Sequence, residues 1–566
     1  MSIISINSDY ELTNIDHNFK ISAGPGAGKT YWLVNHIKNI LHNSNKLSIT
    51  RKIACITYTN TAVETIYKRL GTSSTQVEVS TIHSFLYKHI VKPYASFIAD
   101  QYNLDISKMD GHDDIILSNY SFLNEWKKKT KQQRIREDDV VIRAFKELRW
   151  QISNGDLVVK TPYPFMVEKY AIKNDSYFEY KKMAWEKGVI HHDDVLFFSY
   201  QILKQYPYVT TVLLAKFPFL VIDEFQDCNP IQIEIFKSLG LVGIITGVIG
   251  DPYQSIYKFQ GADYTQFDFF NLPQIQEYRL NENRRSSNEI VDLLNHIRTD
   301  IIQIPYRNIS IDKPKILIGD MALALKMCKA LCNQEMVNSL SRINITSNAM
   351  KAEISGTNLD SKLLEKLVST DKPSSANKYR SKLIMSCVKS IAYAKEDKFK
   401  DAIKELERFF NYKIDKIRGK RKALKYITIL LNEYDKYKDS SLIEFSEFVR
   451  LNLDSNITKV SRGGVKVFYE SYTFSQLLLC VSIPEDLSLH KTIHKSKGDQ
   501  FKNVLLVLKE ENDIDFLLKP DLERNEEHRI YYVALSRARN NLFISVPSLH
   551  KNKYKLLEKH FKMEIF

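Results

Sequence analysis

The first residues suited to chemistry form a glycine-rich stretch near the start of the chain, SAGPGAGKT at positions 22–30. Its glycines let backbone N–H groups point at phosphate oxygens. The side chain of Lys29 can then reach the β- and γ-phosphates, and the hydroxyl of Thr30 can bind Mg²⁺. The stretch therefore predicts a nucleoside triphosphate site, and the residues expected around the phosphates are Gly24, Pro25, Gly26, Ala27, Gly28, Lys29 and Thr30.

Two adjacent carboxylates, Asp223 and Glu224, follow the apolar run at 219–222. Carboxylates at the end of a buried strand lie where a parallel sheet binds its ligands. One of them can hold Mg²⁺, and the other can orient or deprotonate the attacking water. With the phosphate loop upstream, the pair indicates hydrolysis of the triphosphate rather than binding alone.

A third candidate group follows the apolar run at 244–249. Gln254 can reach a γ-phosphate or the attacking water, and the aromatic residues Tyr257 and Phe259 lie within five residues of it. Aromatic rings beside a nucleotide sensor can couple hydrolysis to base stacking. Taken alone, however, the two rings are better explained as core residues.

A sheet flanked by helices must position these groups. A short strand is expected at 19–22, and apolar spacing from residue 31 to residue 41 predicts a helix after the loop. The helix N-terminus would add its partial positive charge at the phosphates. The expected fold class is therefore α/β, with helices packed on parallel strands.

Length and charge fit a multidomain protein with a polyanionic partner. The chain has 566 residues and a formal net charge of +14, which suits about three or four domains and a nucleic acid. The richness in Lys, Asn, Ile and Tyr gives the same basic balance through AT-rich coding, so charge alone is weak support. The six cysteines form no CxxC pair, and the N-terminus lacks the pattern of a signal peptide. We expect a cytoplasmic protein without disulfides.

Eight segments resemble, in order, the motifs of the UvrD/Rep/PcrA family of superfamily 1A DNA helicases. They are AGPGAGKT (23–30), ITYTNTA (56–62), STIHSF (80–85), VIDEFQD (221–227), GDPYQSIY (250–257), LNENRRSS (280–287), TIHKSKGDQF (492–501) and RIYYVALSRA (529–538). The resemblance implies an ATP- and Mg²⁺-dependent helicase or translocase that moves 3′→5′ on single-stranded DNA. It also implies two RecA-like P-loop domains with parallel sheets, each carrying a mostly helical insertion.

The resemblance implies a role for each matching residue. Lys29 would contact the phosphates, Thr30 and Asp223 would hold Mg²⁺, and Glu224 would be the catalytic base. Contacts to the γ-phosphate are implied for Gln254 and for Arg285 and Arg537, both expected from the second RecA-like domain. Tyr257 would stack on adenine and Gln500 would bind the ribose. The implied DNA-binding residues are Tyr58, Asn60, His83, Phe259 and His494.

The chain departs from the family pattern at several positions. Residues 1–20 contain no Gln to read adenine, and Gln500 stands where a glutamate is usual. A neutral glutamine still accepts a hydrogen bond from a ribose hydroxyl, so we expect only modest weakening there. Motif IV has Arg284 where an aromatic residue is common. Adenine specificity is therefore left open.

The motifs divide the chain into four parts. We expect a first RecA-like domain at 1–84 and 200–275, with a helical insertion (1B) at 85–199. A second RecA-like domain is expected at 276–340 and 462–566, with a short helical insertion (2B) at 341–461. A basic run at 395–425 within the second insertion fits either a duplex clamp or the solvated face of a helix, and its interleaved acids favour the latter slightly.

The His191-His192-Asp193-Asp194 cluster resembles a metal site, but adjacent side chains do not converge on one face of a helix. We expect Asp193 to cap a helix instead, and no metal other than the Mg²⁺ of the nucleotide.

Several functional hypotheses remain. The first is a helicase or translocase, in DNA repair or in defence. The second is a DNA-responsive ATPase switch that regulates a partner protein. Compact chains of this kind resemble the helicase subunit of the Gabija anti-phage system, whose partner is an OLD-family (TOPRIM) nuclease. No nuclease cluster is evident in the sequence, so any cutting is expected from another chain. A P-loop ATPase unrelated to nucleic acid is the least favoured reading.

Overall fold

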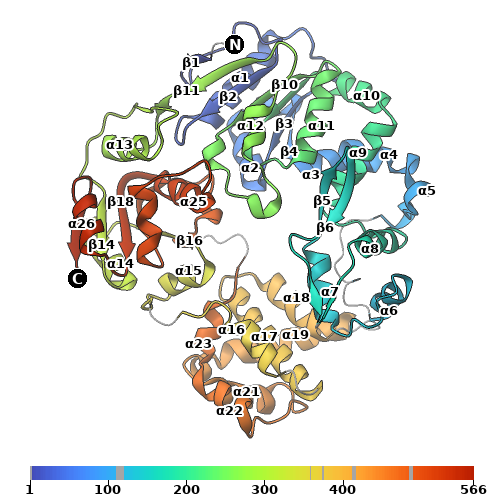
Figure 1. Cartoon of the computed structure of the whole chain (residues 1–566), viewed down its shortest axis with the longest axis vertical. Coiled ribbons are helices and arrows are strands. Elements are labelled where there is room, and N and C mark those ends of the chain that lie inside the picture. Colours follow the sequence, from blue (N-terminus) through green and yellow to red (C-terminus); the bar gives the residue numbers. More distant parts are fainter. Residues whose placement is uncertain are drawn as a thin grey trace. The chain divides into compact units, whose positions relative to one another are not determined.

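The computed structural model describes residues 3–109, 116, 120–167, 169–356, 359–371, 375–410, 416–483 and 488–566 (Figure 1). It divides into two units. Unit 1 comprises Met1–Arg285, Arg298–Arg307 and Leu522–Arg529, and unit 2 comprises Ser286–Ile297, Asn308–Asp521 and Ile530–Phe566. In this described part of the chain, no helix is long and apolar enough to cross a lipid bilayer.

Unit 1 is built on a seven-stranded, entirely parallel sheet. Its strands, in spatial order, are β1 (Ile4–Ile6), β11 (Gln276–Leu280), β2 (Phe19–Ala23), β10 (Ile245–Gly250), β9 (Phe219–Ile222), β3 (Ile53–Thr57) and β4 (Val77–Thr81). The strands expected at 19–22, 219–222 and 244–249 are thus confirmed as the three central neighbours β2, β9 and β10. Because all strands are parallel, their carboxyl ends meet at one edge of the sheet.

Both faces of this sheet are covered by helices, because buried side chains alternate along each strand. In β3, Ile53 and Cys55 join one core cluster while Ala54 and Ile56 join the other. The first cluster includes side chains of α1 (Lys29–Asn43) and α2 (Asn60–Leu70). The second includes side chains of α9 (Asp194–Gln205), α10 (Tyr208–Lys216) and α11 (Pro230–Leu241).

The insertion expected at 85–199 shares this second core, so it belongs to unit 1. Its helices are α3 (Ile82–Leu86), α4 (Lys92–Tyr94), α5 (Ala99–Tyr102), α6 (Tyr120–Lys129), α7 (Asp138–Lys146) and α8 (Asp175–Trp185). It also contains two small antiparallel sheets, formed by β5 (Arg149–Ser153) with β6 (Asp156–Lys160) and by β7 (Met166–Val167) with β8 (Tyr170–Ala171). Unit 1 is completed by α12 (Thr265–Phe269) and by the parallel pair β12 (Glu282–Asn283) and β13 (Ile304–Pro305).

Unit 2 contains a second, six-stranded parallel sheet. Its order is β16 (His490–Thr492), β15 (Asn338–Ser341), β17 (Phe501–Val507), β18 (Ala538–Val546), β14 (Lys315–Ile318) and β19 (Lys562–Ile565). The helices outside the insertion are α13 (Asn288–Ile297), α14 (Met321–Leu331), α15 (Asn344–Lys351), α24 (Asp515–Leu518), α25 (Glu526–Leu535) and α26 (Lys551–Leu557). The first turn of α25 falls in unit 1 by the division above. Two sheets of this kind confirm the expected α/β class with two RecA-like domains.

A separate helical core, running from residue 363 to residue 483, forms the insertion of unit 2. Its helices are α16 (Leu363–Thr370), α17 (Ser375–Ala394), α18 (Phe399–Phe410), α19 (Lys416–Asn432), α20 (Tyr434–Tyr437), α21 (Leu442–Asn452), α22 (Gly463–Ser471) and α23 (Phe474–Leu479). The insertion therefore begins and ends about twenty residues later than the expected 341–461. The basic run at 395–425 begins just after α17 and falls on α18 and α19, and its residues 411–415 lie outside the described part.

One buried histidine makes the stability of unit 1 depend on pH. His36 of α1 stacks on Trp32 with ring centroids 4.7 Å apart, and neither ring nitrogen has a hydrogen-bond partner. Burial lowers its pKa to about 3. Since the unfolded value is about 6.5, folding below that pH requires His36 to lose a proton. Stability is therefore fully present above pH 6.5 and falls as the pH drops from 6.5 towards 3.

We expect unit 1 to lose about 1.4 kcal/mol of unfolding free energy through His36 between pH 7.5 and pH 5.5. The measurement is urea unfolding followed by tryptophan fluorescence, because all four tryptophans lie in unit 1. His36→Leu should reduce the pH dependence by that amount, whereas His42→Leu, at an exposed position on the same helix, should not. Equal pH dependence in wild type and His36→Leu would contradict this role.

Candidate functional site

The phosphate loop lies between β2 and α1, as the sequence predicts. Gly26 and Gly28 have φ of 74° and 85°, a region that favours glycine. A Cβ at Gly24 would lie 2.4 Å from the side-chain nitrogen of Gln303, so a side chain here would displace that amide from the Pro25 carbonyl oxygen to which it donates. Lys29 and Thr30 form the first turn of α1, where the helix N-terminus favours negative charge. The loop is therefore shaped for phosphate oxygens.

The two carboxylates directly follow β9, which is separated from the strand of the phosphate loop only by β10. Asp223 is buried, and its Oδ1 accepts a hydrogen bond from the Glu224 backbone N–H at 3.0 Å. Burial, and then the charge of Glu224, raises the pKa of Asp223 above its usual value, while Lys29 opposes this rise. Such a concentration of buried negative charge fits a divalent cation with oxygen ligands.

Glu224 has an unusual backbone conformation, with φ of 52° and ψ of 41°. A non-glycine residue in this region carries strain, and such strain is frequent at functional sites. Its Oε2 accepts a hydrogen bond of 2.5 Å from Gln226 Nε2, whose Oε1 accepts one of 2.9 Å from the Asp251 backbone N–H. The carboxylate pair is thereby tied to the end of β10.

A buried ion pair stabilises the segment after β10. Asp251 is fully buried and lies 2.7 Å from Arg298 Nη1, which is also buried. Gln254 Nε2 donates a hydrogen bond of 2.6 Å to Asp251 Oδ2. The predicted γ-phosphate sensor is thus held in one network with Glu224 and Gln226, on the neighbouring strand.

The segment at 282–285 lies directly against the phosphate loop, within unit 1. Asn283 Nδ2 and Gln303 Nε2 both donate to the Pro25 carbonyl oxygen, at 3.2 Å and 2.8 Å. A Cβ built on Gly26 would lie 2.9 Å from Cβ of Arg285. The structure therefore differs from the expectation that Arg285 comes from the second RecA-like domain, because β11 joins the first sheet and carries this segment with it.

Three predicted residues lie in unit 2. Arg537 is buried between α25 and β18 and donates to the carbonyl oxygen of Val533 at 3.1 Å. Gln500 is exposed just before β17, and His494 is half-buried after β16. The roles of these three residues stay predictions.

Three of the predicted DNA-binding residues line one cavity of unit 1, with a volume of about 350 Å³. Tyr58 follows β3, His83 lies on α3 after β4, and Phe259 follows β10. Asn60, at the exposed start of α2, is not among the lining residues. We call this cavity the aromatic cavity. Its full lining is Tyr58, Thr81, Ile82, His83, Arg149, His191, His192, Asp193, Asp227, Asn229, Gln232, Phe259 and Gln260.

Tyr257 lies with this group. Its ring stacks on Tyr58, with centroids 4.9 Å apart and planes 19° apart, and its centroid lies 5.9 Å from that of Phe259. It is a buried neighbour of the aromatic cavity, in keeping with the core interpretation weighed for it above. At the phosphate loop, Asn283 and Gln303 donate to the Pro25 carbonyl oxygen, and Ser8, Arg284 and Arg285 lie beside the loop glycines. Stacking of Tyr257 on adenine remains untested.

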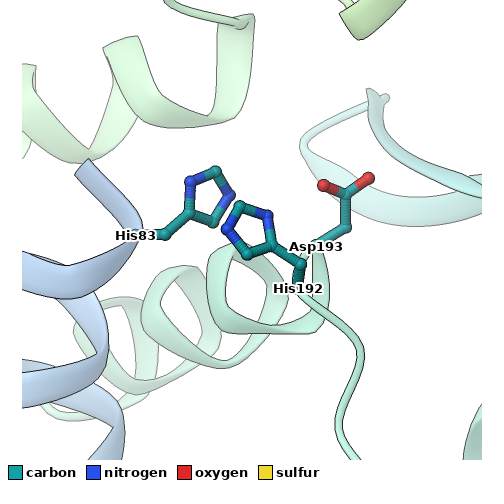
Figure 2. Close-up of side chains that lie close together, drawn as sticks. All are labelled: His83, His192 and Asp193. Atoms are coloured by element: carbon teal, nitrogen blue, oxygen red, sulfur yellow. The ribbon is translucent and has the colours of Figure 1, made fainter. Parts of the chain in front are cut away.

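The acidic loop before α9 contradicts the expected helix cap. Asp193 occupies the N-cap position of α9, but its side chain makes no capping hydrogen bond. Asp194 is buried instead and accepts hydrogen bonds from the indole N–H groups of Trp150 and Trp185, at 2.9 Å and 3.0 Å. The tertiary partners of Asp194 thus decide the geometry of this loop. Figure 2 shows His192 of the loop facing His83.

Sequence reasoning missed several residues of the site. Asn283 lies within a quoted motif but received no role, and Gln303, Arg298 and Asp251 were not singled out. Asn283 could have been found from its motif. Arg298 and Gln303 carry no local signal for these contacts, because Asp251 lies 47 residues from Arg298 and Pro25 lies 278 residues from Gln303.

Comparison with known proteins gives the family. A family model described as the UvrD/REP helicase N-terminal domain matches residues 8–272. Another, described as the UvrD-like helicase C-terminal domain, matches residues 264–548, half of the chain.

Three relatives illustrate the degree of similarity. Gabija protein GajB of Bacillus cereus (strain HuB5-5) is 26% identical over 347 residues, which cover 53% of this chain and 49% of that protein. ATP-dependent DNA helicase Rep of Escherichia coli (strain K12) is 27% identical over 286 residues, covering 49% and 40%. ATP-dependent DNA helicase PcrA of Bacillus subtilis (strain 168) is 26% identical over 292 residues, covering 49% and 37%. The matched stretches span half or less of these relatives.

Two family models in series along the chain, together with a phosphate loop and a carboxylate pair at one edge of the same parallel sheet, place this chain in the UvrD/Rep helicase family.

Proposed function

We propose that this chain is an ATP-dependent DNA helicase that translocates 3′→5′ on single-stranded DNA and requires Mg²⁺. One observation carries the proposal. The triphosphate residues follow β2 and β9, and the predicted DNA-binding residues that line the aromatic cavity follow β3, β4 and β10. Since these are neighbouring parallel strands of one sheet, hydrolysis and strand binding would share one sheet edge.

The proposed roles at the nucleotide follow from this arrangement. Lys29 holds the phosphates, Thr30 and Asp223 hold Mg²⁺, and Glu224 is the base for the attacking water. When bound, Mg²⁺ neutralises the charge that develops on the phosphoryl oxygens. Gln254 relays the state of this site through Asp251, to which it is hydrogen-bonded.

At the aromatic cavity, exposed rings would stack on bases. Phe259 is 64% exposed, so one face of its ring is open to a ligand. Stacking reads no sequence, and binding is expected to tolerate any sequence. Because Tyr257 stacks on Tyr58, we propose that Tyr257 supports the aromatic cavity rather than stacking on adenine.

A second candidate function rests on the likeness to Gabija protein GajB. In this alternative the chain is a DNA-responsive ATPase of an anti-phage system and regulates a partner, which we propose to be an OLD-family (TOPRIM) nuclease. A general repair helicase is the third possibility, supported by the likeness to Rep and PcrA. An adjacent nuclease gene would favour the second candidate.

Strand displacement separates these candidates. We expect the isolated chain with ATP and Mg²⁺ to displace a strand from a 3′-tailed duplex and not from a 5′-tailed or blunt duplex. ATPase stimulated by single-stranded DNA, without displacement of any substrate, would favour the switch. Stimulation of neither activity by DNA would contradict both.

A matched pair of variants tests the aromatic cavity in the same assays. Phe259→Ala should weaken binding of single-stranded DNA by about 1–3 kcal/mol, because it removes one stacking ring. Phe269→Ala is the control, since Phe269 is equally solvent-accessible (74% exposed) but does not line the cavity. Equal affinities for the two variants would remove Phe259 from the strand-binding surface.

A further inference from the structure

Three metal-ligating side chains meet at the wall of the aromatic cavity. His83 comes from α3, and His192 and Asp193 come from the loop before α9, more than a hundred residues later. One donor atom from each lies within 4.8 Å of the others. Figure 2 shows the imidazole of His192 in front of that of His83, with the Asp193 carboxylate beside them.

The loop that supplies two of the three donors is stabilised by the buried carboxylate of the next residue, Asp194. Asp194 is 1% exposed and lies 2.7 Å from Lys181 Nζ. It also accepts hydrogen bonds from the two indoles and, at 2.9 Å, from the His191 backbone N–H. These partners fix the backbone at 191–194. The folded loop therefore loses little further conformational entropy when its side chains bind a metal.

The two histidines can supply nitrogen ligands. His83 Nε2 is buried and makes no hydrogen bond. His192 is exposed towards solvent, and its ring stacks on that of His83 with centroids 3.7 Å apart. Each imidazole has a ring nitrogen that can offer a lone pair to a metal.

Asp193 supplies the third donor. Its carboxylate is 19% exposed and faces Arg149 Nε at 3.7 Å, a long ion pair with a partly exposed arginine. A contact of that length contributes little and is readily exchanged. A cation bound directly to the carboxylate would compensate this buried charge far better.

We propose that His83, His192 and Asp193 bind a divalent transition-metal ion of the zinc class. Two imidazoles and one carboxylate suit zinc and its neighbours rather than Mg²⁺, which prefers oxygen ligands. Tetrahedral coordination with bonds of about 2.0–2.2 Å places ligand atoms about 3.3–3.6 Å apart. The exposed side chain of His192 and the partly exposed side chain of Asp193 reach this spacing by rotation about their side-chain bonds. The fourth position faces the aromatic cavity, where water or a phosphate oxygen completes the shell.

Cobalt spectroscopy tests the site directly. Metal-free full-length protein without an affinity tag is titrated with Co²⁺ in excess Mg²⁺, which occupies oxygen-only sites. We expect a visible d–d absorption band that saturates at one Co²⁺ per chain and disappears on addition of Zn²⁺. His192→Ala and Asp193→Asn should each weaken Co²⁺ binding by about tenfold or more.

The control is His191→Ala, which changes the neighbouring histidine of the same loop and the same cavity. It should keep the affinity for Co²⁺. Absence of the band in wild type, its survival in both ligand variants, or equal loss in His191→Ala would each overturn the assignment. Because His192 is exposed, its replacement leaves the core intact, and circular dichroism checks this for each variant.

The metal site lies at the cavity assigned to strand binding, but its test is independent of the test of the proposed helicase activity. Mg²⁺-dependent ATP hydrolysis by the wild-type chain is measured on the same preparation. Hydrolysis without the cobalt band would contradict the metal site but not the helicase proposal. The cobalt band without hydrolysis would contradict the helicase proposal but not the metal site.

Discussion

Replacing Lys29 with alanine should lower ATP hydrolysis by about a thousandfold. The side chain leaves the first turn of α1 beside Gly28, so its ammonium reaches the phosphates that the loop holds. Losing one preorganised charge that stabilises developing phosphoryl charge costs about 10²–10³ in rate. Lys29 also opposes the raised pKa of Asp223, so its removal leaves the carboxylate pair less compensated. Steady-state phosphate release with and without single-stranded DNA measures the effect.

Lys38→Ala provides the matched control, because it removes a lysine from the same helix nine residues further on. This variant should hydrolyse ATP like wild type. Retention of DNA-stimulated turnover in Lys29→Ala would contradict the assignment of the phosphate loop, and with it the proposed function. Loss of turnover in both variants would point to damage of α1 rather than to a role at the phosphates.

The central part of the first sheet could be predicted because its signals are local. The apolar runs that became β2, β9 and β10 are each followed at once by polar or glycine residues. In a parallel sheet, this order alone places Lys29 and Asp223 at the same edge. The phosphate loop and carboxylate pair therefore needed no knowledge of tertiary contacts.

Contacts between distant segments could not be predicted in this way. The place of β11 beside β2 depends on strand pairing, and no residue of 276–280 indicates which strand is the partner. It moves Arg285 into unit 1, contrary to a boundary drawn between motifs. Likewise, His83 received its role from a motif, and nothing in the sequence near it signals His192 as its neighbour.

The start of the second helical insertion was placed too early for a related reason. The residues of α15 fall within 341–461, the range expected for the second insertion. In the structure Ala349 and Met350 pack in the core of the second sheet, and Ser347 Oγ donates to the His490 carbonyl oxygen at 2.8 Å. An amphipathic helix shows which face is buried but not against which partner.

The isosteric change Glu224→Gln should leave nucleotide bound but slow its hydrolysis by about 10²–10⁴, the usual contribution of a general base. A carboxamide matches the carboxylate in shape but cannot accept the proton of the attacking water. The phosphate loop and Asp223 remain, so ATP and Mg²⁺ keep their contacts. Binding is measured with a fluorescent ATP analogue, and the chemical step by single-turnover hydrolysis.

Glu224→Gln is informative because nucleotide affinity and the rate of the chemical step are expected to respond differently. The strained backbone at Glu224 and its hydrogen bond from Gln226 hold the carboxylate in one orientation, which a base requires and a merely structural residue does not. Glu234→Gln, at a half-exposed carboxylate on α11, should change neither quantity. Normal single-turnover hydrolysis in Glu224→Gln would remove its role as base. A loss of nucleotide affinity with an unchanged single-turnover rate at saturating ATP would instead assign Glu224 to the binding of Mg²⁺, because a ligand of the cation stabilises the ground state and the transition state alike.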